Sequence, residues 1–89
     1  MSRTYKVGQI TSTSTQVVAR YFVTDANPDN KEEINTRPHA AEFPISVMYD
    51  QDLQEKRAEA FCDFMNKLEE AKKVAYDQVH LVDMLSRNP

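Results

Sequence analysis

The sequence has little glycine and cysteine and no tryptophan. Gly8 is the only glycine in 89 residues, so the chain has no glycine-rich loop of the kind that cradles a phosphate. Cys62 is the only cysteine, which excludes an intramolecular disulfide. This cysteine usage favours a cytoplasmic protein, located in the host cytoplasm if the chain is viral.

Long apolar runs and an excess of positive charge are also missing. No stretch approaches the roughly 20 apolar residues of a membrane span, and Met1–Lys6 has no signal-peptide pattern, so we expect no membrane partner. The net charge of −3 argues against a strongly basic nucleic-acid binder. The length predicts one small domain over residues 1–89 with only a modest core, which a second subunit would help to stabilise.

Two segments near the N-terminus have the pattern of β-strands. Tyr5–Ile10 is the first, and Gly8 inside it favours a bulge or a close contact. Gln16–Thr24 alternates with period two and is the clearer strand. The hydroxyl-rich segment between them predicts a hairpin over residues 1–24.

The middle of the chain is first polar and then shows alternating apolar and polar residues. Residues 25–41 predict a long loop with turn chemistry around Pro28 and Pro38, in which residues 31–34 suit one helical turn. Residues 42–50 predict a third strand. Pro44 cannot donate a hydrogen bond to a ladder, so this strand should lie at a sheet edge or begin there.

The last two-fifths of the chain predict one long helix over residues 52–87, without glycine or proline inside. At 1.5 Å per residue it would be about 50 Å long, whereas strands of seven to nine residues span only about 25–30 Å. A break near Asn66 or Lys72, with the helix folding back as a hairpin, is the alternative.

These elements predict an α+β fold: a three-stranded antiparallel meander followed by one long C-terminal helix that packs on the sheet and extends into an oligomer interface. The distal helix gains a second apolar line, which predicts an interface made of Val74, Leu81, Val82 and Leu85. The core is expected to contain Val7, Val17, Ala19, Tyr21, Val23, Phe43, Ile45, Val47, Phe61, Phe64 and Leu68.

No residue pattern predicts catalysis, a metal or a cofactor. Tyr76, His80 and Asp83 occupy neighbouring helical positions, but a solvated helix face explains them better than a metal site. Cys62 is expected on the polar side of the helix beside Asp63, with no base to activate it. We therefore expect a protein that is not an enzyme.

These observations predict a small oligomeric binding protein, a regulator or inhibitor that occupies a surface of another macromolecule, most simply another protein. This size and lack of motifs are typical of proteins encoded by phages or mobile elements. The expected contact surface is the 25–41 loop together with the hairpin tip, because loops on a rigid scaffold carry recognition. The expected partner-binding residues in the loop are Asn27, Asp29, Asn30, Arg37 and His39. The acidic face of the helix is a second candidate surface, which would bind a basic partner or mimic the charge of a nucleic acid.

A different class of function stays open at the level of the sequence. Lys6, Arg20 and Phe22 combine positive charge with an aromatic ring, as single-stranded nucleic-acid-binding modules do. A small ligand held between subunits is a further alternative, without a supporting motif.

Overall fold

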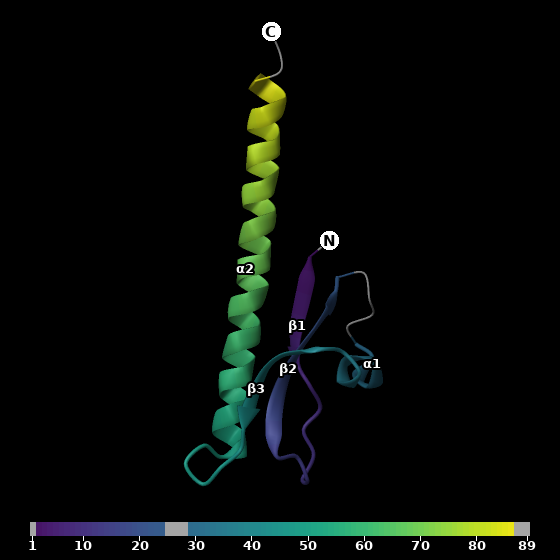
Figure 1. The fold of residues 1–89 in the computed structure, drawn as a ribbon, viewed down its shortest axis with the longest axis vertical. Coiled ribbons are helices and arrows are strands. Elements are labelled where there is room, and N and C mark those ends of the chain that lie inside the picture. Colours follow the sequence, from purple (N-terminus) through teal and green to yellow (C-terminus); the bar gives the residue numbers. More distant parts are fainter. Residues whose placement is uncertain (1, 25–28, 87–89) are drawn as a thin grey trace.

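The computed structural model describes residues 2–24 and 29–86, with side chains throughout except at 76, 77 and 79–86. Three strands and two helices follow one another along the chain (Figure 1). They are β1 (Arg3–Val7), β2 (Gln16–Val23), α1 (Lys31–Asn35), β3 (His39–Pro44) and α2 (Gln51–Ser86). This is the predicted α+β arrangement, with a long C-terminal helix packed on the sheet.

The sheet is an antiparallel meander in the order β1-β2-β3. Tyr5 of β1 lies opposite Tyr21, and Val17 of β2 lies opposite Phe43. The register between β2 and β3 shifts between Ala19 and Arg20. Gly8 follows β1 and donates its backbone N–H to the Val18 carbonyl at 2.8 Å. Each strand thus has one face toward α2 and one face away from it.

The third strand begins and ends earlier than the prediction of residues 42–50. β3 runs from His39 to Pro44, and its ladder closes where the Ile45 N–H donates to the Thr15 carbonyl at 3.0 Å. The chain then turns, because the Ser46 N–H donates to the Tyr49 carbonyl at 2.8 Å. A local turn therefore overrides the alternation of apolar residues after Pro44. β3 is an edge strand, as Pro44 requires.

The predicted helical turn inside the 25–41 segment is the short helix α1. It lies on the side of the sheet away from α2 (Figure 1) and contacts β2. Its Ile34 is buried, and Phe22 on the same side of β2 is only 3% exposed. α1 therefore covers part of the second sheet face.

The long helix is continuous from Gln51 to Ser86, without a break at Asn66 or Lys72. Asp50 caps it, since its Oδ1 accepts the Leu53 N–H at 2.9 Å. α2 extends well past the sheet (Figure 1), and the molecule measures 64 × 27 × 15 Å. Its radius of gyration is 17.4 Å, against about 12 Å for a compact chain of this length. The predicted excess of helix over sheet is confirmed.

The face that α2 turns to the sheet differs from the predicted one. The residues that meet the sheet most closely are the small Ala58 and Cys62, which are buried. The Phe61 ring packs edge-on against Tyr5, at 6.4 Å between centroids, and against Phe43, at 6.0 Å. The helix is therefore rotated away from its bulkiest stripe, and Cys62 faces the sheet instead of solvent.

The core prediction is consequently right for some residues and wrong for others. Val17 and Ala19 are fully buried, whereas Val7, Tyr21, Phe43, Ile45 and Phe61 are half-buried. Four residues expected in the core are exposed: Val23, Val47, Phe64 and Leu68. The strand ends before Val47, and the rotation of α2 turns Phe64 and Leu68 outward. Five buried apolar residues were not predicted: Tyr5, Phe22, Ile34, Ala58 and Cys62.

Candidate interaction surfaces

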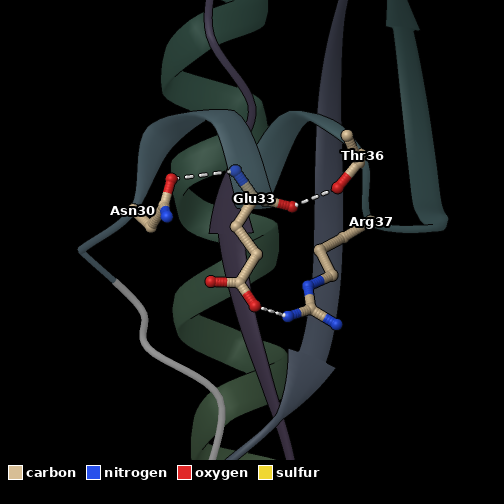
Figure 2. A network of polar contacts seen from close by, with 4 residues as sticks. All are labelled: Asn30, Glu33, Thr36 and Arg37. Atoms are coloured by element: carbon tan, nitrogen blue, oxygen red, sulfur yellow. Dashed lines mark hydrogen bonds and ion pairs between the residues drawn. The ribbon is translucent and has the colours of Figure 1, made fainter.

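Two of the five polar residues predicted to bind a partner are engaged in holding α1. Asn30 caps this helix, because its Oδ1 accepts the Glu33 N–H at 3.1 Å. The Thr36 hydroxyl donates to the Glu33 carbonyl at 2.8 Å, and the Arg37 guanidinium forms an ion pair with the Glu33 carboxylate. Figure 2 shows these four residues around one turn of helix. Asn30 and Arg37 therefore have local structural roles.

The other three predicted loop residues are not gathered into one site. Asn27 lies outside the described residues. Asp29 is strongly exposed and lies 4.0 Å from the Lys6 ammonium. His39 is on the edge strand β3, where its Nδ1 lies 2.7 Å from Glu42 Oε1. Asp29 precedes α1 and His39 lies on β3, so the two described side chains belong to different parts of the fold.

The residues of the nucleic-acid alternative are placed less favourably than their sequence suggests. Phe22 is buried, so its ring offers no stacking surface. Arg20 donates from Nη1 to the Arg37 carbonyl at 2.6 Å and lies on Gly8, where a Cβ would meet its Nε at 2.9 Å. This is the close contact expected at Gly8. Of these three residues, only Lys6 has an exposed cationic group.

A shallow cleft of about 590 Å³ lies where the end of β1 meets α1 and α2. Its walls carry cations and acids together, among them Lys6, Lys31, Glu55 and Glu59. The mixture of both signs gives no preference for an anionic or a cationic ligand.

Among the described side chains, the most exposed apolar ones lie in the turn between β3 and α2. Val47 is 102% exposed and Met48 is 84% exposed. The turn is held by the Ser46–Tyr49 backbone bond and by the Tyr49 N–H, which donates to Ser46 Oγ at 3.2 Å. Arg57 lies over the Tyr49 ring at 5.2 Å. We call Val47, Met48 and Tyr49 the apolar tip.

The apolar tip projects from the same end of the molecule as the β1–β2 connection (Figure 1). Sequence reasoning missed it, because the alternation from Phe43 to Tyr49 was interpreted as a core strand. The signal that marks the turn is the pair Ser46 and Asp50, whose side chains both accept backbone N–H groups.

A second exposed apolar surface runs along α2. Phe64 is 63% exposed, and Leu68 and Val74 are also exposed. Ala60, Ala71 and Ala75 are exposed between them. Of the predicted oligomer interface, Val74 is therefore on the surface, whereas the side chains of Leu81, Val82 and Leu85 lie outside the described ones.

Cys62 is the one group among the described side chains whose ionisation is clearly altered. Burial, with help from the nearby carboxylates Asp63 and Glu59, raises the pKa of its thiol from 9.0 to about 11. A thiol that stays protonated is a poor nucleophile. Among the described residues, no group of three or more His, Cys, Asp or Glu side chains is placed to hold a metal ion. The side chains of Tyr76, His80 and Asp83 are not among those described.

Comparison with known proteins gives no relative: no family model, no curated protein and no solved structure matches this chain. Neither described helix is long and apolar enough to cross a membrane.

Proposed function

We propose that the protein is a small, oligomeric, non-enzymatic binding protein that acts as a regulator or inhibitor by occupying a surface of another macromolecule. The observation that carries this proposal is the full exposure of Val47 and Met48 on an ordered turn. Exposing apolar side chains to water has a cost of roughly 1.5–3 kcal/mol each relative to burial, which a partner would recover.

The chemistry around the apolar tip indicates the kind of partner. Asp50 and Asp52 follow it directly at the N-terminus of α2, and both are exposed. A matching surface would present an apolar pocket bordered by basic groups. A protein offers that combination, so a protein is the proposed target. The 25–41 segment contributes through Asp29 and His39, which remain on the surface.

The nucleic-acid alternative is not proposed, since the buried Phe22 leaves it without a stacking group.

The test is capture of the target from a lysate of the source organism, followed by mass spectrometry. We expect the wild type to retain a defined protein that Val47→Asp with Met48→Asp loses. Both side chains are exposed, so the double variant should fold normally, which circular dichroism checks. Lys73→Asp, at an exposed position of α2 far from the apolar tip, is the matched control and should retain the same protein.

Two results would contradict the proposal. One is a captured protein that binds the tip variant as well as the wild type. The other is the absence of any protein that distinguishes the two chains.

A further inference from the structure

The apolar surface of α2 that points away from its own sheet is long and continuous. We call it the outer face, and it consists of Ala60, Phe64, Leu68, Ala71, Val74 and Ala75, all of which are exposed. At 100° per residue its centre lies roughly 120° around the helix from Ala58, Phe61 and Cys62, which meet the sheet. α2 therefore has two apolar faces, and the sheet occupies only one of them.

The sheet edges do not offer an alternative route to assembly. The Tyr5 backbone points away from β2, and its N–H and C=O are bonded to Asn66 at 2.8 and 3.0 Å. On the other edge Pro44 has no N–H, and its carbonyl accepts from Gln54 at 2.6 Å. Association through an added strand is thus disfavoured at Tyr5 and Pro44.

We propose that the outer face of α2 packs against the outer face of a second copy of this chain, with the two helices antiparallel. The proposal deepens the oligomeric part of the proposed function and rests on it. The face is self-complementary in shape, because it alternates bulky residues with alanines. Antiparallel pairing centred between Leu68 and Glu69 brings the two Leu68 side chains together and sets Phe64 over Ala71 and Ala75 of the second copy.

Charge favours the same orientation. Lys67 and Glu70 are exposed on one flank of the outer face. In the antiparallel pair this flank meets its own copy, so Lys67 lies opposite Glu70 twice. In a parallel pair this flank would instead meet the opposite flank of the second copy, where Lys67 would lie near Lys72, and like charges there oppose association.

The geometry also uses the part of α2 that outruns its sheet (Figure 1). When two such helices pair antiparallel about residue 68, each sheet lies at the level of the other copy's distal helix. The excess length of each chain is then matched by the folded part of the other.

Sedimentation equilibrium tests the interface. The wild type should have twice the 10.3 kDa chain mass, and Phe64→Glu should have the chain mass alone. Lys73→Glu places the same acidic side chain at an exposed site on the opposite side of α2 and should stay a dimer. A monomeric wild type, or an assembly that Phe64→Glu leaves intact, overturns the proposal.

A charge exchange tests the orientation. Lys67→Glu and Glu70→Lys should each raise the dissociation constant by roughly tenfold, and the double variant should return it close to the wild-type value. If Lys67→Glu alone tightens association, the helices are parallel and the proposal is wrong.

Disulfide formation gives a second measure of orientation. Leu68→Cys should cross-link two chains, because residue 68 lies at the two-fold axis. Ala75→Cys should not, since each residue 75 lies at the level of residue 62 of the other copy, roughly 20 Å along the helix from its equivalent. Cross-linking of both variants would indicate a parallel pair. Target capture uses other variants, so failure here is distinguishable from failure of the apolar tip.

Discussion

Two carboxamide side chains of α2 reach the two outer strands of the sheet. Asn66 donates to the Tyr5 carbonyl and accepts the Tyr5 N–H, and so takes the place of a neighbouring strand. Gln54 is only 2% exposed and donates to the Pro44 carbonyl. A half-buried backbone group without a partner costs about 1–3 kcal/mol. These two residues therefore fix the helix across the sheet as well as satisfying its edges.

Asn66→Ala is expected to lower the free energy of unfolding by about 1–3 kcal/mol, because both backbone groups of Tyr5 lose their partner. Denaturant unfolding measures the change. Lys73→Ala, at an exposed position two turns further along the same helix and outside the outer face, is the control and should change stability by less than about 0.5 kcal/mol. An Asn66→Ala protein as stable as this control would show that water replaces the side chain.

Cys62 makes the stability of the folded protein depend on pH in the alkaline range. The folded thiol loses its proton near pH 11, whereas the unfolded thiol loses it near 9.0. Between these values the folded state binds more protons than the unfolded state, so stability falls as the pH rises from 9 toward 11. Cys62→Ala should flatten this part of the stability curve, as measured by urea unfolding at several pH values. An unchanged slope would contradict this assignment.

At the scale of the element, the rotation of α2 follows from the shape of the sheet. Tyr5, Tyr21 and Phe43 project from the covered face and surround the contact with Phe61. A helix approaches such a surface closely only through small residues, and Ala58 and Cys62 provide them. The bulkier Phe64 and Leu68 are displaced outward. The contact between helix and sheet thus depends on a few small side chains.

Paired substitutions test this rotation. Phe61→Ala should cost about 3 kcal/mol, because its ring packs between Tyr5 and Phe43. Phe64→Ala should cost less than about 1 kcal/mol in the isolated chain, since its ring is exposed. Both are measured by denaturant unfolding at protein concentrations where the chain is monomeric. The reverse order of the two losses would mean that Phe64 is the residue facing the sheet.

The existence and type of most helices and strands follow from the sequence. The rotation of α2 against the sheet and the end of β3 do not. Period-two alternation locates β2 to within one residue, and the uninterrupted helical pattern locates α2 equally well. The rotation of α2 depends on side chains from three strands at once, which a one-dimensional pattern does not contain. The end of β3 depends on Ser46, whose local turn competes with the pattern of alternating apolar residues.

The surfaces were harder to predict than the fold. Polar loop residues such as Asn30 and Arg37 are typical of binding sites, but they are equally suited to capping a short helix. Apolar residues such as Val47 and Phe64 were assigned to the core because their type is usually buried. The structure places Val47 and Phe64 on the surface instead of in the core, and it gives Asn30 and Arg37 local roles at α1. An exposed apolar side chain has no signature of its own in a single sequence.

At the scale of the whole molecule, α2 has two parts that differ in their contacts. Its first part completes a small core with the sheet, and its remainder extends beyond any surface that the described chain offers (Figure 1). A helical segment without tertiary contacts is only marginally stable in water. Its helicity should therefore depend on the antiparallel pairing.

Phe64→Glu is accordingly expected to lower the helical circular dichroism signal relative to Lys73→Glu. The decrease should be proportional to the length of α2 that loses its contacts with the second copy. Far-ultraviolet spectra of the two variants at equal concentration measure this difference. Equal spectra would show that the extended part of α2 is stable by itself.

The blocked backbone groups on β1 and β3 affect whether the protein forms fibrils at high concentration. Fibrils grow when one molecule's backbone templates the next, and here a proline and two carboxamides occupy the places where templating would begin. Polymerisation of the amyloid type is thereby discouraged without help from a second chain. We therefore expect concentrated solutions of the protein to stay free of fibrils.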